Sequence, residues 1–209
     1  MPVAQLVSVL APPLCWDCGA PAADGQPLCP GCRLSLRWLG PETVPLAGVA
    51  TWAPVSYEGP ARALVRGLKF RGAAAIAEAM AAQIAARVPP RLLEESTLAP
   101  VPLHPSRQRR RGFNQAERLA RALAERTGLG LAACLDRSGP SRPQTGRPRA
   151  DRVTAMRGAV TATRRPPPRV VLVDDVATTG ATLAACAGAL RAAGADRVVA
   201  LAYARTPAR

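Results

Sequence analysis

The stretch Val170–Leu183, with the sequence VVLVDDVATTGATL, decides the fold of this chain. It begins with four consecutive apolar residues, which is typical of a strand buried on both faces of a parallel sheet. Two adjacent carboxylates, Asp174 and Asp175, follow where that strand is expected to end. A turn of small residues and an alanine-rich helix over Ala181–Ala193 come next. The stretch therefore predicts a strand–turn–helix unit of an α/β fold.

The turn after the two acids has the chemistry of an anion site. Ligands of open α/β sheets bind beyond the carboxyl ends of the strands, and the free N–H groups at a helix start attract phosphate. Glycine in the turn lets the backbone approach a ligand, and the threonine hydroxyls add donors. The predicted phosphate-binding residues are Val176, Ala177, Thr178, Thr179, Gly180, Ala181 and Thr182. We expect ribose hydroxyls or a Mg²⁺ ion on Asp174 and Asp175.

These residues resemble the phosphoribosyl-pyrophosphate (PRPP) signature of type I phosphoribosyltransferases, which is four apolar residues, two acids and a Thr-Gly-x-Thr turn. The alternative is a generic strand–turn–helix with a capping threonine and a solvated acid pair. The resemblance implies PRPP with Mg²⁺ as ligand and Asp174 and Asp175 as catalytic residues. Phosphoribosyl transfer breaks the bond from ribose C1 to pyrophosphate, and the acceptor supplies the nucleophile. The protein must therefore hold the phosphate, orient the ribose and neutralise the diphosphate.

Two CxxC pairs, Cys15 with Cys18 and Cys29 with Cys32, are separated by ten residues. Four thiolates at this spacing can surround one tetrahedral Zn²⁺. Two disulfides or a redox pair are the alternatives. Disulfides require export, and the sequence before Cys15 has no Lys or Arg of the kind that begins a signal peptide. A thioredoxin-like pair is expected near a βαβ pattern, and none is near. We therefore expect a structural zinc ion, with the two other cysteines, Cys134 and Cys186, as small core residues.

Length and charge set further bounds. A chain of 209 residues fits one medium domain with a small addition. No apolar run is long enough to span a membrane, so we expect a cytoplasmic protein. The net charge is +14, and residues 101–169 alone contain sixteen Arg against four acids. Such an excess attracts polyanions, either pyrophosphate groups or nucleic acid, although a general preference for arginine also contributes, since Lys69 is the single lysine.

Four arginines lie in the predicted loop Pro105–Asn114, which follows a predicted strand over Thr97–Leu103 and is placed to meet the pyrophosphate. Arg107 and Arg111 are the predicted PRPP ligands, Arg111 foremost because a glycine follows it. The alternative is a solvated or DNA-facing arginine patch. The sequence leaves the roles of two further residues open. His104, beside the loop, either contacts phosphate or has a structural role. Lys69 either faces the same cleft or is a surface lysine.

Hydrophobic periodicity places the remaining elements. Helices are predicted over Gly59–Phe70 and Ala74–Val88, and a third begins at the cap residue Asn114, with Glu117 at the capping-box position, and ends at Gly128. A helix over Met1–Leu14 and a lid or disordered loop over Ser138–Arg157 are also expected. Further strands are predicted over Thr51–Tyr57, Leu129–Leu135, Val170–Val173 and Arg197–Tyr203. The alternation of strands and helices predicts a parallel sheet with helices on both faces.

A narrower resemblance covers nearly the whole chain. After the four cysteines come the motifs Tyr57-Glu58-Gly59-Pro60, Leu68-Lys69-Phe70, Val101-Pro102-Leu103, Arg111-Gly112-Phe113-Asn114-Gln115 and Pro143-Gln144-Thr145, followed by the acid pair and its turn. This order resembles the ComF family of amidophosphoribosyltransferase-like competence proteins. The chain departs from the family pattern at Arg147, Ala155 and Val160, where the family usually has Leu, Asn and Phe.

The ComF resemblance implies a type I phosphoribosyltransferase-like parallel sheet flanked by helices, with a zinc-knuckle module over residues 1–45 and a phosphoribosyltransferase-like domain over residues 46–209. It also implies a role in DNA uptake during natural transformation. Two functions follow as expectations. The first is a phosphoribosyltransferase of unknown acceptor. The second is a non-catalytic competence factor that keeps the PRPP site and binds single-stranded DNA or a helicase.

Overall fold

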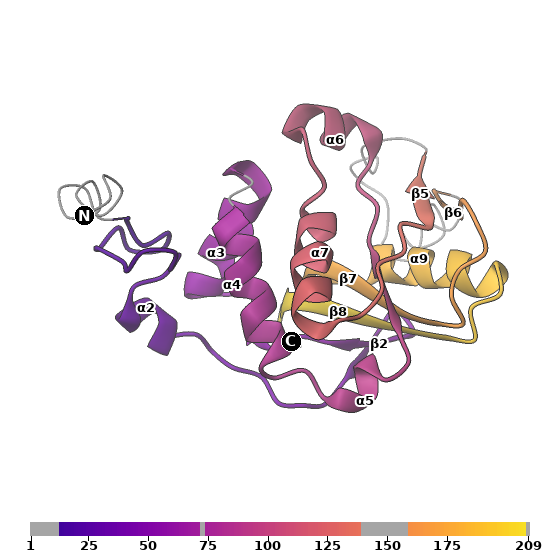
Figure 1. Ribbon diagram of the computed structural model, residues 1–209, viewed down its shortest axis with the longest axis horizontal. Coiled ribbons are helices and arrows are strands. Elements are labelled where there is room, and N and C mark those ends of the chain that lie inside the picture. The colour runs from indigo at the N-terminus through magenta and orange to yellow at the C-terminus, as the bar shows by residue number, and fades with distance from the viewer. Residues whose placement is uncertain (1–12, 72–73, 139–158, 208–209) are drawn as a thin grey trace.

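The computed structural model describes residues 13–71, 74–138 and 159–207. They form a mixed α/β structure in which helices flank a mostly parallel sheet, and a cysteine-rich segment lies at the N-terminal end (Figure 1). The predicted N-terminal helix and the predicted lid lie, except for their end residues, outside the described residues. Within the described residues no helix has the length and apolarity that a membrane crossing requires.

The sheet has the strand order β1-β2-β8-β7-β4, and β3 also pairs with β8. The central strands β7 (Arg169–Ala177) and β8 (Arg197–Arg205) run parallel to each other and to β4 (Thr97–Pro100) and β2 (Val49–Trp52). The edge strand β1 (Val44–Leu46) is antiparallel to β2. Continuous apolar sequence buries β7 and β8 on both faces, as expected for parallel strands.

Each face of the sheet has its own hydrophobic core, and alternate residues of β7 point to opposite faces. Val171 and Val173 join the core under α3 (Gly59–Arg71), α4 (Ala74–Ala85) and α7 (Gln115–Thr127). Val170 and Leu172 join the core under α9 (Ala181–Ala192). Helices therefore cover both faces of the sheet, as the sequence predicts.

The connections that follow the neighbouring parallel strands β4 and β7 leave to opposite faces of the sheet. After β4 it passes through α7 on one face and reaches Leu131, which forms a parallel bridge with Leu98. After β7 it passes through α9 on the other face and reaches β8. Adjacent parallel strands whose connections leave to opposite faces create a crevice at their carboxyl ends, which is the usual ligand position in open α/β sheets.

Several predicted bounds are wrong, each for a local reason. The predicted strand over Thr51–Tyr57 is two strands, β2 and β3 (Val55–Ser56), with Pro54 between them. The predicted strand over Leu129–Leu135 is only the single bridge at Leu131. The chain then forms a separate hairpin of β5 (Leu135–Arg137) with β6 (Val160–Ala162). The strand ending at Val173 in the prediction continues to Ala177, because β8 pairs with it that far.

The predicted arginine loop Pro105–Asn114 is also wrong, because most of it is a helix, α6 (Pro105–Arg111). Proline stands at its first turn, the ring of His104 accepts the N–H of Ser106, and Gly112 ends it at φ 77°. This cap is the structural role of His104. A short helix α5 (Pro90–Leu93) follows α4, and α2 (Pro30–Leu34) follows the cysteines. The predicted boundary between residues 45 and 46 falls inside β1, and the division into two domains stays a prediction.

Candidate functional site

The two acids lie at the carboxyl ends of β4 and β7, the position at which open α/β sheets usually bind their ligands. The last residue of β4, Pro100, pairs with Val173, so Asp174 and Asp175 extend beyond the end of β4. On the other side β7 still pairs with β8, since Asp174 stands opposite Ala202. The acids therefore belong to an extended strand rather than to the turn after it, and they continue past the last β4 residue that pairs with β7.

Asp174 and Asp175 face opposite sides of the sheet, because successive side chains of a strand alternate. Asp175 is on the side of α3 and α7 and is buried, with 2% of its surface exposed. Asp174 is on the side of α9 and is partly exposed. Its Oδ1 accepts the backbone N–H of Asp175 at 2.8 Å. Desolvation, and then the neighbouring carboxylate of Asp175, raise the pKa of Asp174 well above its usual range.

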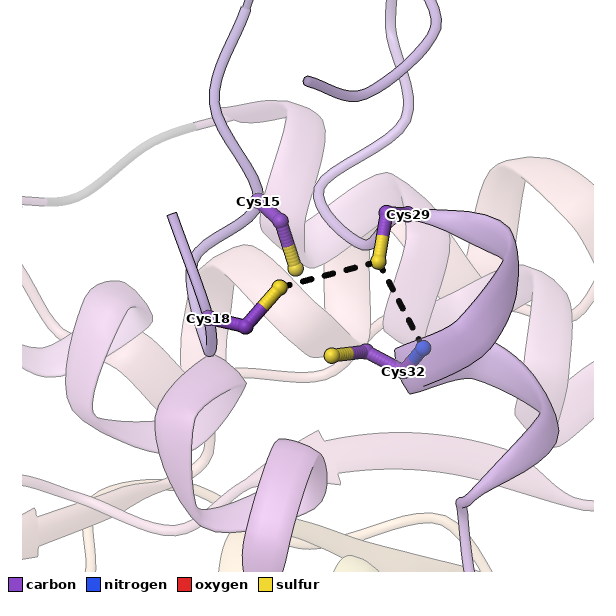
Figure 2. Close-up of side chains that lie close together, drawn as sticks. All are labelled: Cys15, Cys18, Cys29 and Cys32. Carbon is purple, nitrogen blue, oxygen red and sulfur yellow. Dashed lines mark hydrogen bonds between the residues drawn. The ribbon is translucent and has the colours of Figure 1, made fainter. Parts of the chain in front are cut away.

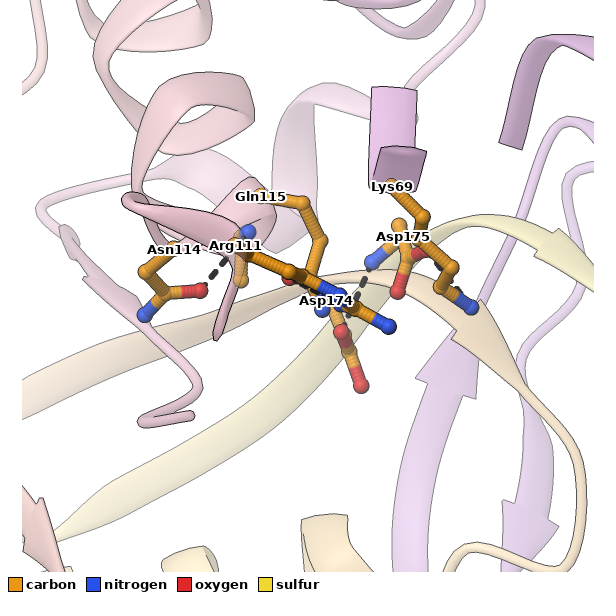
Figure 3. A network of polar contacts seen from close by, with 7 residues as sticks. Lys69, Arg111, Asn114, Gln115, Asp174 and Asp175 are labelled. Carbon is orange, nitrogen blue, oxygen red and sulfur yellow. Dashed lines mark hydrogen bonds and ion pairs between the residues drawn. The ribbon is translucent and has the colours of Figure 1, made fainter. Parts of the chain in front are cut away.

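Lys69 of α3 contacts the acid pair on the face of the sheet that α3 covers. Its Nζ lies 2.9 Å from Asp175 Oδ2, and the side chains of the two residues are 20% and 3% exposed (Figure 3). Asp175 Oδ2 has no hydrogen bond within the described residues, so the ion pair with Lys69 is its polar contact there. Lys69 is therefore a partner of the acid pair and not an isolated surface lysine.

Arg111 ends α6 above the same acids (Figure 3). It donates to Gln115 Oε1 at 2.8 Å, and its guanidinium carbon lies 5.6 Å from the centre of the Phe70 ring. Burial lowers the pKa of Arg111, while the charge of Asp175 raises it. Its Nε is buried without a hydrogen-bond partner in the described part of the chain. A buried donor of this kind is available to an anionic ligand.

Asn114 fixes the start of α7. Because Arg111 donates to Gln115, the first residue of α7, this cap also helps to hold Arg111. The Asn114 side chain accepts the N–H of Ala116 at 3.0 Å and donates to the carbonyl of Val101 at 3.0 Å. The cap thus ties α7 to the end of β4. Glu117, at the predicted capping-box position, instead pairs with Arg121 at 3.3 Å.

Arg137, at the end of β5, is a site residue that the sequence reasoning missed. Burial, and then the charge of Arg107, lower the pKa of Arg137, while Cys186 and Asp174 raise it. Arg137 is thus a partly buried cation whose pKa responds both to Asp174 and to the exposed Arg107. The hairpin of β5 and β6 has strands of three residues, which is too short to show a periodic pattern in sequence.

The predicted phosphate loop is shorter than expected, because Val176 and Ala177 belong to β7. Thr178 and Thr179 are exposed, and their backbone N–H groups donate no hydrogen bond within the described residues. Gly180 precedes α9 at φ 76° and has no side chain to cap the helix, while Thr179 Oγ1 accepts the N–H of Ala181 at 3.5 Å. The N–H groups of Thr178 and Thr179, the nearby hydroxyls and the start of a twelve-residue helix fit an anion.

Gly180 is required for a reason other than contact with a ligand. A Cβ atom at this position would lie 2.6 Å from Leu46 Cβ and 2.8 Å from the backbone carbonyl of Leu46. The hairpin of β1 and β2 therefore packs directly on the turn. This approach, together with the positive φ, permits only glycine at position 180.

Four cysteines near the N-terminus form a compact cluster (Figure 2). The sulfur atoms of Cys15, Cys18, Cys29 and Cys32 all lie within 4.8 Å of one another, and all are free thiols. Cys29 caps α2 by accepting the N–H of Cys32 at 3.5 Å. No disulfide joins these four sulfur atoms in this structure. The donor set can hold a metal ion such as zinc, which prefers four sulfur ligands in structural sites.

The electrostatics of the cluster also suit a cation. Burial opposes ionisation of Cys15, yet the backbone N–H groups of Cys18, Cys29 and Asp17 lower its pKa to about 6. Burial, and then Cys18 and Asp17, raise the pKa of Cys32. One thiolate thus forms readily and hinders the next, which is the situation that a bound divalent cation relieves.

The cysteine cluster packs on α3, the helix that carries Lys69. Trp16 lies against Gly67, where a Cβ would be 2.8 Å from its ring. Beside this contact an open groove of about 870 Å³ is lined by Leu14, Trp16, Arg62, Arg66 and Phe70 among others. Phe70 also lies under Arg111, so the groove and the acid site meet at this ring.

Comparison with known proteins finds no family model and no curated protein that matches this chain.

Proposed function

We propose that this chain is a ComF-like protein of the type I phosphoribosyltransferase family that binds PRPP with Mg²⁺. The observation that supports this proposal most is the position of Asp174 and Asp175. They extend past the end of β4, where the connections of β4 and β7 leave to opposite faces of the sheet, and the start of helix α9 follows them. The order of the sequence motifs supports the narrower assignment to the ComF family.

In this proposal each part of PRPP has a partner of suitable chemistry. The N–H groups and hydroxyls of Thr178–Thr182 bind the 5′-phosphate. Asp174 and Asp175 orient the ribose hydroxyls, and their carboxylate oxygens are the donors that would hold Mg²⁺. The ion would neutralise charge on the diphosphate. Arg111 and Arg107 add fixed positive charge on the side where that group leaves, which stabilises the transition state.

Binding is tested by titrating PRPP, with and without Mg²⁺, into the purified protein in a calorimeter. A pyrophosphate-release assay with candidate acceptors then tests catalysis. Mg²⁺-dependent binding of PRPP supports the proposal, and release of pyrophosphate extends it to an enzyme. Absence of PRPP binding with and without Mg²⁺ contradicts it.

A second candidate function is a non-catalytic competence factor that binds single-stranded DNA or a helicase. It is favoured by the composition of α6, which carries four arginines and no acid, three of them exposed: Arg107, Arg109 and Arg110. An exposed helix of this charge attracts the phosphate backbone of nucleic acid whatever its base sequence. Retention of single-stranded DNA without turnover of PRPP would favour this function over the enzyme.

A further inference from the structure

Asp175 is the more deeply buried acid of the site, and Lys69 covers it. The ammonium lies 2.9 Å from Asp175 Oδ2, and only 3% of the Asp175 side chain is exposed. A divalent cation bound to that oxygen would sit at about 2.0–2.6 Å from it, within a few ångströms of the ammonium. Two like charges this close in a buried site repel strongly. A free cation and Lys69 therefore compete for Asp175.

Lysine at this position is itself informative. It is the single lysine among 28 basic residues, so every other cationic side chain in the sequence is arginine. An arginine would grip the carboxylate with two parallel hydrogen bonds, whereas an ammonium is a point charge on a flexible stem. The Lys69 side chain is 20% exposed, so solvent reaches it although its partner is closed off. These properties suit a cation that must hold Asp175 and also release it.

A second cationic side chain, Arg111, lies near Lys69 on the same side of the acid pair. Phe70 follows Lys69 on α3, and Arg111 lies over its ring, with its buried Nε unpaired in the described structure. Positive charge is thus concentrated on the α3 side of the acid pair. An anionic ligand in the crevice would attract Lys69 and Arg111 together.

We propose that Lys69 guards Asp175: in the empty site it excludes free divalent cations, and it yields the carboxylate only when a phosphorylated ligand enters. Metal and ligand then arrive together, because the anionic ligand compensates both the metal and the displaced ammonium. The identity of the ligand rests on the proposed function, whereas the competition between Lys69 and a free cation does not.

The test measures Mn²⁺ binding by electron paramagnetic resonance, in protein supplied with equimolar Zn²⁺ so that the cysteine cluster is filled. Without any phosphosugar, Lys69→Met should bind Mn²⁺ at least about tenfold more tightly than the wild type, because one like charge is removed. Adding Asp175→Asn to Lys69→Met should abolish that gain. Lys69→Arg keeps the charge and should stay as weak as the wild type. Arg66→Met removes one charge from an exposed position of the same helix and should change little.

Circular dichroism tests whether each variant is folded. If Lys69→Met does not fold, Lys69→Gln takes its place. No gain of Mn²⁺ affinity in a folded Lys69 variant overturns the proposal, and so does a gain that survives Asp175→Asn. With PRPP present, the wild type and Lys69→Met should retain Mn²⁺ to similar extents. If the wild type binds no PRPP, the proposed function fails, while the comparison with Mn²⁺ alone still decides the role of Lys69.

Discussion

Asp174 and Asp175 are neighbours in sequence, yet they project from opposite faces of β7 and have different partners. Asp175 is ion-paired with Lys69 of α3, whereas Asp174 Oδ1 accepts the backbone N–H of Asp175, and the charge of Asp175 helps to raise the pKa of Asp174. Both acids stand beyond the last residue of β4 that pairs with β7. This geometry gives the two carboxylates separate roles that single substitutions can distinguish.

Asp174→Asn should stabilise the protein at neutral pH. The pKa of Asp174 is raised in the folded state by desolvation and by Asp175. The folded protein thus holds this proton more tightly than the unfolded chain, whose pKa is about 3.9. Stability is lost as the pH rises from that value through the raised pKa, and asparagine avoids the loss. Each unit of pKa difference corresponds to about 1.4 kcal/mol.

Thermal unfolding across a pH series measures this effect. The gain from Asp174→Asn should be present near pH 7 and vanish below about pH 4. Asp196→Asn, at an exposed carboxylate, is the control and should change little at either pH. A gain that is equal at both ends of the series would show that ionisation of Asp174 is not its cause.

Gly180→Ala should destabilise the protein strongly. The substitution adds a Cβ in the left-handed region, at about 1–2 kcal/mol, and forces it against Leu46, at about 1–3 kcal/mol more. Gly128→Ala is a matched control, because Gly128 has φ 72° and nothing within 4 Å of its Cβ position. Urea unfolding should show the larger loss for Gly180→Ala. Equal losses would mean that β1 does not pack on the turn.

Cys18→Ser should remove the metal and loosen the segment around the cysteines, while the sheet survives. Four sulfur ligands predict about one Zn²⁺ per chain in protein purified under reducing conditions. Metal analysis gives the stoichiometry, and tryptophan fluorescence reports the segment through Trp16, which packs on Gly67. Cys134→Ser, at a buried cysteine outside the cluster, should keep the metal. Four intact thiols without any metal would refute the zinc site.

Single-stranded DNA should bind weakly and without sequence preference if the second candidate function holds. Arg109 and Arg110 are exposed on α6, and replacing both with Gln should reduce the slope of log affinity against log salt by about 1.4, since each phosphate contact contributes about 0.7. Arg165→Gln with Arg169→Gln removes the same charge elsewhere. If PRPP competes with DNA, the two ligands share the region of α6. No retention of DNA at low salt would exclude this function.

The sequence predicts the acid pair, its helix and the cysteine cluster because each is a local pattern with a fixed spacing. It fails where tertiary docking decides. The arginine run of α6 has no apolar stripe, so only its caps, His104 and Gly112, make it a helix. Arg137 belongs to the small sheet of β5 and β6, and Lys69 contacts Asp175 because α3 and β7 share one core on the same face of the main sheet. Neither arrangement leaves a signal in the spacing of residues.

The proposed binding of PRPP through Asp174 and Asp175 has a direct test. Titration calorimetry with PRPP and Mg²⁺ should therefore be compared between the wild type and Asp174→Asn/Asp175→Asn, with sulfate as the second ligand. The double substitution should weaken PRPP binding much more than sulfate binding, because sulfate needs only the turn before α9. Equal PRPP affinity in the two proteins would contradict the proposal.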